Sequence, residues 1–199
     1  MKEFLMSAPM EKIPPTHRLI TVEEYYRMAE IGLLKPDSRV ELIEGAIVDM
    51  APIGMRHNSA LNKLNRWLNL AAGERAIVGA GNSFRLSNIT EPQPDLLLLK
   101  PRADFYSSRI ATAEDTLLVV EVSDTTLRYD RNVKVPLYAR YGVPEVWIVD
   151  VEGSCLHCFH ALANATYTET ETTASPGAIA VRGLDGVTVD LSHLLQPAE

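Results

Sequence analysis

The sequence predicts an α/β domain, and two observations support this prediction. Residues 116–123 form an aliphatic run that is too short for a membrane span and rich in β-branched side chains, as a buried strand is. Residues 146–150 form a second aliphatic run, and a stretch with helical spacing of apolar residues separates the two. A single helix between two strands indicates a right-handed parallel crossover.

The helix between these strands is predicted from a 3.6-residue stripe of apolar side chains: Val133, Leu137, Tyr138 and Tyr141. We expect Asp130 to be its N-cap and Gly142 to end it. Lys134 falls in the first turns. Pro136 predicts a kink or a late helix start, because proline has no backbone N–H to donate.

The other elements are predicted from caps, turn residues and alternation. Before the crossover we expect a helix after the capping box Thr21–Glu24, a hairpin at 39–50 turning at Glu44-Gly45, a helix at 57–72 closed by Gly73, and strands at 76–86 and 93–99. After it we expect strands at 155–161, 167–173, 178–181 and 187–191, then a helical turn at 191–195.

Length and composition favour one globular domain. A chain of 199 residues with 46% hydrophobic and 23% charged residues can bury an ordinary core. Residues 1–18 contain prolines and no signal-peptide core, which predicts a flexible arm before a single domain at 19–199. The net charge of -7 argues against a broad basic surface for nucleic acid, although a local one remains compatible with it.

The cysteine content and the hydropathy indicate a compartment. Cys155 and Cys158 are the two cysteines, and they offer no disulfide framework. No apolar run approaches the length of a membrane span. We therefore expect a cytoplasmic protein that does not associate with a membrane.

Two carboxylates lie in or beside aliphatic runs, where an acid needs a partner to offset the cost of burial. Asp95 directly precedes the run 96–99, and Glu121 lies near the end of the run 116–123. Side chains two apart in a strand share a face, so Glu121 and Ser123 are expected to point to the same side. If the two strands are neighbours, both acids meet at one site, and Lys134 follows in the next helix.

Two carboxylates and an ammonium group are enough for metal-assisted hydrolysis of a phosphodiester. Carboxylate oxygens bind hard cations such as Mg²⁺. A bound cation lowers the pKa of a water molecule and offsets the charge that builds on a phosphoryl group. The ammonium group can orient that water or the phosphate. The sequence thus indicates a Mg²⁺-dependent hydrolase, with Mn²⁺ as the alternative ion.

Several short motifs occur in an order that spans the chain from about Leu19 to Leu195. They are Thr21–Tyr25, Glu41–Gly45, His57, Pro94-Asp95, Glu121–Ser123, Asp130 with Lys134 and Tyr138, Gly142–Asp150 and the ending Gly183–Leu195. In their joint order and spacing they resemble the Uma-type family of restriction endonucleases, within the PD-(D/E)XK nuclease superfamily.

This resemblance implies a restriction endonuclease-like core, a central mixed β-sheet flanked by helices, with the C-terminal β-strands as additions. It implies an endonuclease acting on DNA, in which Asp95, Glu121 and the backbone carbonyl of Val122 hold the metal ion. Lys134 would assist the attacking water, and Glu41 would contribute a further carboxylate. No organic cofactor is expected. A homodimer is an open alternative, because cutting both DNA strands takes two sites.

The chain departs from the superfamily pattern at one position. The residue two after the strand acid is lysine in the superfamily, whereas here it is Ser123. The Uma-type family uses a lysine of the following helix, which corresponds to Lys134, and a long lysine side chain can reach from there. One alternative is a nuclease-fold binding or interaction module with weak or absent catalysis. A nuclease for RNA or branched DNA is a further hypothesis.

The candidate residues also have structural interpretations. These are an ion pair of Glu121 with an arginine, a turn cap at Asp95, a solvated hairpin acid at Glu41, and a polar helix start at His57. A second set of residues, Arg128, Arg131 and Arg140, forms either a solvated helix face or a phosphate-contacting surface.

The segment Cys155-Leu-His-Cys158, with His160 nearby, raises the question of a zinc site. Residues 155 and 158 of a strand face opposite sides, and no second ligand pair occurs elsewhere in the sequence. We therefore do not expect these two cysteines to share a zinc ion. Trp147 and Asp150 are expected to fill the core and finish a strand.

Overall fold

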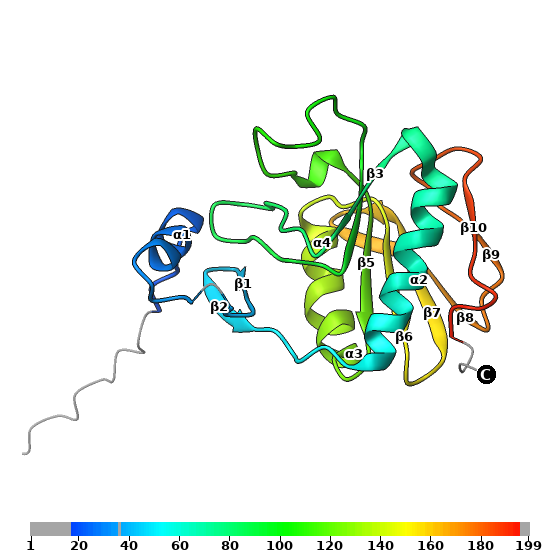
Figure 1. The fold of residues 1–199 in the computed structure, drawn as a ribbon, viewed down its shortest axis with the longest axis horizontal. Coiled ribbons are helices and arrows are strands. Elements are labelled where there is room, and N and C mark those ends of the chain that lie inside the picture. The colour runs from blue at the N-terminus through cyan, green and yellow to red at the C-terminus, as the bar shows by residue number, and fades with distance from the viewer. Residues whose placement is uncertain (1–16, 36, 196–199) are drawn as a thin grey trace, which may run out of the picture.

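The computed structural model describes residues 17–35 and 37–195, which are organised around a six-stranded sheet (Figure 1). The strands follow one another in space in chain order: Ile77–Ala80 (β3), Leu96–Leu99 (β4), Thr116–Ser123 (β5), Val146–Asp150 (β6), Cys155–Ala163 (β7) and Thr166–Ala174 (β8). β5 and β6 are parallel, and the other neighbouring strands are antiparallel. The predicted mixed sheet and parallel crossover are confirmed.

Helices flank the sheet, as predicted for an α/β domain (Figure 1). Helix α2 (Met55–Ala72) buries Leu64 and Leu68 against β4, β5 and β6 on one face. The other face is covered by the crossover, which consists of α3 (Leu127–Tyr129), the π-helical turn η3 (Asp130–Lys134) and α4 (Val135–Arg140). Two short 3-10 turns complete the helices: η1 (Gly73–Arg75) and η2 (Ala113–Asp115).

The alternation along β5 decides which side chains face the site. Val120 and Val122 belong to the apolar cluster beneath α2, whereas Val119 belongs to the cluster beneath α4. Glu121 therefore points to the α4 side, where its carboxylate accepts a hydrogen bond from the hydroxyl of Tyr138. This arrangement agrees with the predicted alternation.

The N-terminal segments form a small unit at one end of the sheet (Figure 1). Helix α1 (Val22–Glu30) begins with the predicted capping box between Thr21 and Glu24. Strands β1 (Val40–Ile43) and β2 (Ala46–Asp49) form a separate hairpin whose turn residues Glu44 and Gly45 both have positive φ. A backbone bridge between Leu42 and Glu91 joins this hairpin to the loop that precedes β4. The hairpin is thereby held beside the start of β4.

The C-terminal strands are present as predicted. β8 is the exposed edge of the main sheet, and β9 (Ala178–Ala180) pairs with β10 (Thr188–Asp190) in a sheet of their own. The helical turn predicted at 191–195 is wrong. The Asp190 carboxylate instead accepts hydrogen bonds from the backbone N–H and hydroxyl of Ser192, a local arrangement that competes with helix formation.

Two other boundaries differ from the predictions. The strand predicted at 76–86 ends at Ala80, because Gly81 adopts a left-handed conformation with φ 62°. The crossover helix begins at Leu127, so the N-cap prediction for Asp130 is wrong. Pro136 lies in the first turn of α4, directly after the π-helical turn, which fits the predicted irregularity.

Within the described residues, no helix combines the length and the apolar character needed to cross a membrane. Residues 1–16 of the predicted N-terminal arm lie outside the described part of the chain.

Candidate active site

The sheet topology places Asp95 beside the end of β5. Because β4 and β5 are antiparallel, the beginning of β4 lies next to the carboxyl end of β5, and their last partners are Leu96 and Val120. Asp95 directly precedes β4, and its Oδ2 accepts a hydrogen bond of 2.7 Å from the backbone N–H of Val122. Glu121 is the neighbouring residue on the same strand. The topology thus brings both acids to one edge of the sheet.

The same hydrogen bond indicates the direction of the Val122 carbonyl. In a strand, the N–H and C=O of one residue point to the same edge. Since β4 has ended at this point, the edge of Val122 that faces Asp95 has no neighbouring strand in the ladder. The Val122 carbonyl oxygen is therefore directed to the side of the site, and Val122 lines the pocket described below.

Glu121 is almost completely buried, with 4% of its surface exposed. Its Oε1 lies 3.2 Å from Nζ of Lys134 and also accepts the Tyr138 hydroxyl. Burial raises the pKa of Glu121 to about 8, with the Lys134 cation opposing the shift and nearby acids adding to it. A carboxyl group with this pKa exchanges a proton near neutral pH.

Lys134 lies in the π-helical turn and is buried at 5% exposure. Its Nζ is 3.2 Å from Oε2 of Glu41, the same distance as to Glu121. Burial disfavours the ammonium form, but the charges of Glu121 and Glu41 outweigh burial and raise the pKa of Lys134 above its ordinary value. Lys134 is thus a cation at neutral pH. π-Helical turns of this kind are frequent at functional sites.

Glu41 reaches the site from the hairpin, and it is far in sequence from the residues that it contacts there, so no local motif predicts these contacts. Its Oε2 accepts a hydrogen bond of 3.1 Å from the backbone N–H of Gln93, two residues before Asp95. Only 3% of Glu41 is exposed, so the interpretation as a solvated hairpin acid is wrong. The bridge between Leu42 and Glu91 positions this carboxylate.

His57 contacts the carboxylate of Asp95. It lies in the first turns of α2, and its Nε2 is 3.1 Å from Oδ1 of Asp95. The ring is buried, and its Nδ1 has no hydrogen-bond partner within the described residues. An unpaired buried nitrogen is costly, which favours a role at the site over a polar helix start. Both carboxylate oxygens of Asp95 are therefore held by protein groups.

The sequence analysis missed the role of Asp130. This buried acid accepts hydrogen bonds from the hydroxyls of Ser123, at 2.7 Å, and Thr126, at 2.6 Å. Ser123 is itself fully buried. The sequence signal that could have predicted these hydrogen bonds is the presence of hydroxyl residues at the end of β5 shortly before an acid in the following helix.

These side chains line one pocket of about 350 Å³. Six carboxylates and two permanent cations lie in its wall: Glu41, Asp49, Asp95, Glu121, Asp124 and Asp130 as acids, and Arg39 and Lys134 as cations. The pocket therefore has an excess of acidic groups, in a chain whose net charge is also negative.

The donor set fits a hard divalent cation. The carboxylates of Asp95 and Glu121 and the carbonyl of Val122 are oxygen ligands of the kind that Mg²⁺ prefers. In the described part of the chain, the ligand atoms of Glu41, Asp95 and Glu121 do not all lie within 4.8 Å of one another, and Lys134 lies between Glu41 and Glu121. Glu41 is thus a partner of the lysine in this arrangement, rather than a third side-chain ligand.

The structure also decides one of the alternatives left open by the sequence, and it places the three arginines of the crossover. Glu121 pairs with a lysine and a tyrosine, so the interpretation as an arginine ion pair is wrong. Arg140 pairs with Glu44, whereas Arg128 and Arg131 are exposed. The predicted residues Asp95, Glu121, Val122, Lys134 and Glu41 all line one pocket.

Fold and site together define an α/β domain with an acidic, lysine-containing pocket at the end of its only parallel strand pair within the described residues. Residues 22–192 match the Uma2 family, whose description is "Putative restriction endonuclease". This chain belongs to that family, which confirms the resemblance inferred from the sequence. No curated protein matches the chain.

A solved structure supports the fold assignment. It is a crystal structure described as "a putative nuclease belonging to DUF820" from Anabaena variabilis ATCC 29413. It superposes with a TM-score of 0.67 over 88% of this chain and 97% of that one, at 14% sequence identity. At this identity the comparison establishes the shared fold alone.

Proposed function

We propose that this protein is a Mg²⁺-dependent endonuclease that hydrolyses phosphodiester bonds in DNA. The main support is the convergence of Asp95, Glu121 and Lys134 at the carboxyl end of β5, where two acids and one buried cation share a pocket. The family description as a restriction endonuclease supports the nuclease class. Mn²⁺ is the alternative ion.

The acidic character of the pocket supports the need for a metal ion. A phosphodiester is anionic, and a pocket with six carboxylates repels it. Divalent cations at Asp95 and Glu121 would reverse this repulsion. The excess of acids therefore favours a cation-dependent nuclease over a nuclease that binds DNA through basic residues alone.

We assign the roles as follows. Asp95, Glu121 and the Val122 carbonyl hold the ion, which when bound lowers the pKa of a water molecule and offsets charge on the phosphoryl group. His57 fixes the orientation of Asp95, since Nε2 of the ring contacts Oδ1. Tyr138 fixes Glu121 by donating its hydroxyl hydrogen to the carboxylate.

Lys134 supplies the ammonium group of the proposed mechanism, because Ser123, at the position of the motif lysine, carries no charge. Its ammonium group already lies 3.2 Å from Glu121, so it reaches the metal-binding acid from the helix that follows β5. From this position it can donate a hydrogen bond to the attacking water or to a phosphate oxygen. Glu41 holds the ammonium group in place and preserves its charge.

The test is cleavage of supercoiled plasmid by the purified chain with Mg²⁺, with Mn²⁺ and with a chelator. We expect nicking or cutting with either ion and none with chelator. Glu121→Gln should reduce the rate by on the order of 100-fold or more, because the ion supplies several kcal/mol of transition-state stabilisation. Glu74→Gln, an exposed acid in η1, is the matched control and should leave the rate unchanged. Equal cleavage by Glu121→Gln would contradict the proposal.

The second candidate function is a nuclease-fold binding or interaction module. Ser123 in place of the motif lysine favours it, because Ser123 is buried and its hydroxyl donates to Asp130 rather than into a substrate site. Calorimetry separates the candidates: no binding of Mg²⁺ at millimolar concentration would favour the module. A panel of duplex DNA, branched DNA and RNA would distinguish among nucleic acid substrates.

A further inference from the structure

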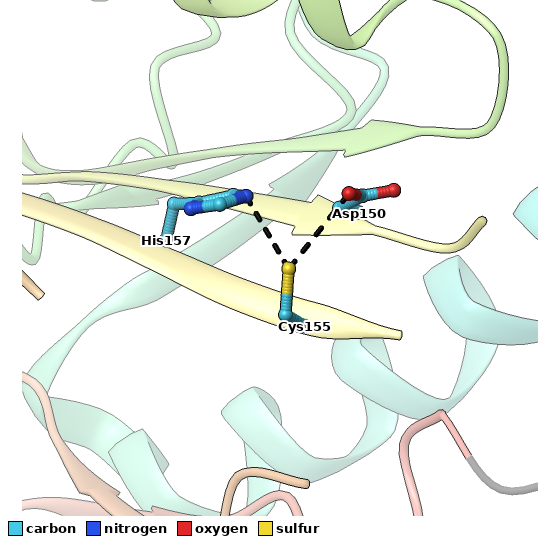
Figure 2. A group of neighbouring side chains, drawn as sticks. All are labelled: Asp150, Cys155 and His157. Carbon is cyan, nitrogen blue, oxygen red and sulfur yellow. Dashed lines mark hydrogen bonds between the residues drawn. The ribbon is translucent and has the colours of Figure 1, made fainter. Parts of the chain in front are cut away.

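A second group of ligand-type side chains lies at the turn between β6 and β7, outside the acidic pocket (Figure 2). The group consists of Asp150 at the end of β6 and Cys155 and His157 at the start of β7. It is the one group of three such residues, in the described part of the chain, whose ligand atoms all lie within 4.8 Å of one another. We propose that Asp150, Cys155 and His157 form a site for a borderline-soft divalent cation, with Zn²⁺ as the best match.

The distances agree with tetrahedral zinc coordination. Sγ of Cys155 is 3.4 Å from Nε2 of His157 and 3.7 Å from Oδ2 of Asp150 (Figure 2). Zn–S bonds of about 2.3 Å and Zn–N or Zn–O bonds of about 2.1 Å, at tetrahedral angles, separate such ligand pairs by about 3.6 Å. The two sulfur pairs therefore match zinc coordination to within a few tenths of an ångström, and the imidazole nitrogen and the carboxylate oxygen lie within 4.8 Å of each other. A sulfur, an imidazole and a carboxylate together suit zinc rather than Mg²⁺.

The outer atoms of two ligands are already held by neighbours. Nδ1 of His157 lies 2.9 Å from the hydroxyl of Thr172 on β8, and with Nδ1–H as the donor, Nε2 keeps its lone pair for a metal ion. Oδ1 of Asp150 accepts a hydrogen bond of 2.7 Å from the backbone N–H of Gly153, which leaves Oδ2 directed at the sulfur. This is the anchoring that metal ligands usually show.

Gly153 provides the space for the Asp150 carboxylate. A Cβ atom at this position would lie 2.2 Å from Oδ2 of Asp150, which no real contact allows. Any larger residue would displace the carboxylate from the group. The turn between β6 and β7 therefore has the residue that this arrangement requires.

Charge and access are also compatible with a bound ion. Zn²⁺ with one carboxylate, one thiolate and a neutral imidazole forms a neutral complex, so the nearby cation Arg131 opposes it little. Burial raises the pKa of the Cys155 thiol, while Arg131 acts in the opposite direction. Without metal, the thiol is therefore protonated, and ion binding releases that proton. Cys155 is partly exposed, which gives an ion a path from solvent.

The site is separate from the acidic pocket, although both lie at the same end of the sheet. Asp150 pairs in register with Ser123 at the end of β5, but none of its three ligands lines the acidic pocket. An ion here would link the end of β6 to the start of β7 and stabilise their turn. Three protein ligands leave a fourth position for water.

The test uses Co²⁺ as a spectroscopic probe on the full chain, without a histidine tag and in a thiol-free reductant. We expect a thiolate-to-cobalt charge-transfer band whose intensity corresponds to one Co²⁺ per chain, together with the visible bands of tetrahedral geometry, both removed by Zn²⁺. Cys155→Ala should abolish the charge-transfer band. Cys158→Ala is the matched control, because Cys158 is buried in the cluster on the opposite face, and it should leave the band intact.

Further variants test the hydrogen-bond partner of the ligand His157 and show whether the site is independent of the acidic pocket. Thr172→Val, at an exposed strand position, should weaken Co²⁺ binding by about 10- to 100-fold, as loss of a ligand's hydrogen-bond partner does. Asp95→Asn and Glu121→Gln should leave the band unchanged, so failure of this proposal and failure of the nuclease proposal are distinguishable. Zn²⁺ should raise the melting temperature of the unmodified chain by more than that of Cys155→Ala.

The result that would overturn the site is a titration of the unmodified chain without a thiolate-to-cobalt band. Retention of the band in Cys155→Ala, or its loss in Cys158→Ala alone, would overturn it equally. The unmodified chain decides the question even if a variant fails to fold.

Discussion

The ammonium group of Lys134 lies 3.2 Å from the carboxylate of Glu121, and both side chains are buried. The contact joins a π-helical turn to the strand that precedes it, on the face of the sheet opposite α2. Lys134 is also 3.2 Å from Glu41, so one cation balances two acids from different parts of the chain. This shared ion pair is the basis of the first predictions.

Removing the Lys134 cation should destabilise the protein. In Lys134→Met, the buried contact between the ammonium group and Glu41 is lost, and breaking a buried pair costs about 3–5 kcal/mol. We expect the free energy of unfolding to fall by that order. Urea denaturation of both proteins measures this.

The control for Lys134→Met is Lys134→Arg, which keeps the charge and should recover a large part of the stability. Lys63→Met removes a solvent-exposed hydrogen bond to the carbonyl of His193, and it should lower the free energy of unfolding far less. Equal losses in Lys134→Met and Lys63→Met would show that the buried pair contributes no special stability.

The raised pKa of Glu121 predicts the pH dependence of stability. Burial raises this pKa from 4.5 to about 8, so between these values the folded chain keeps a proton that the unfolded chain releases. Stability should therefore decrease as pH rises through this window. Glu121→Gln cannot titrate there, and its stability should depend less on pH. A steeper decrease in Glu121→Gln would contradict the assignment.

The same proton should compete with the metal ion. Because Mg²⁺ binds the carboxylate form, its affinity should increase as pH rises toward about 8, and binding should release a proton. Calorimetric titrations in two buffers with different heats of ionisation count the released protons. Binding without proton release below this pH would show that Glu121 is already ionised.

The tyrosine behind Glu121 should affect metal binding as well as stability. Tyr138→Phe removes a hydroxyl that donates to the carboxyl group of Glu121, and a hydrogen bond of this kind contributes about 0.5–1.5 kcal/mol. We expect a lower melting temperature and a changed Mg²⁺ affinity. Tyr167→Phe is the control, because that hydroxyl donates to the backbone carbonyl of Val143, away from the site. It should lower stability while leaving Mg²⁺ affinity unchanged.

His57 should act through Asp95. Its Nε2 is 3.1 Å from Oδ1 of that acid, so His57→Ala should leave the carboxylate free to reorient. Loss of such a supporting contact weakens metal binding by about 10- to 100-fold. We expect the Mg²⁺ concentration for half-maximal cleavage to rise while the rate at saturating Mg²⁺ changes less. An unchanged Mg²⁺ dependence would exclude this positioning role.

Local signals in the sequence were sufficient for most of the fold. The capping box at Thr21, the Glu44-Gly45 turn and the alternation around Glu121 each depend on residues close in the chain, and each matches the structure. The start of the crossover helix was mispredicted because Asp130 bonds to Ser123 and Thr126, tertiary contacts that override its capping preference.

The site was only partly predictable for the same reason. Asp95 and Glu121 stand out because acids beside aliphatic strands are unusual, and the resemblance to a family pointed to Lys134 and Glu41. The pairing of Lys134 with both Glu41 and Glu121 depends on the bridge from the hairpin to the loop before β4, which no sequence spacing indicates. Likewise, Asp150 joins Cys155 and His157 only through the turn at Gly153.

Metal binding by Asp95 and Glu121 is the most direct test of the account. Mn²⁺ binding can be followed by the electron paramagnetic resonance signal of the free ion, with Asp95→Asn, Glu121→Gln and Glu74→Gln as matched variants. We predict that the unmodified chain and Glu74→Gln bind Mn²⁺ with the same affinity, seen as the same decrease in the free-ion signal. Asp95→Asn and Glu121→Gln should each weaken Mn²⁺ binding by on the order of 100-fold. Undiminished Mn²⁺ binding in both of these variants would contradict the proposed metal site and the nuclease mechanism built on it.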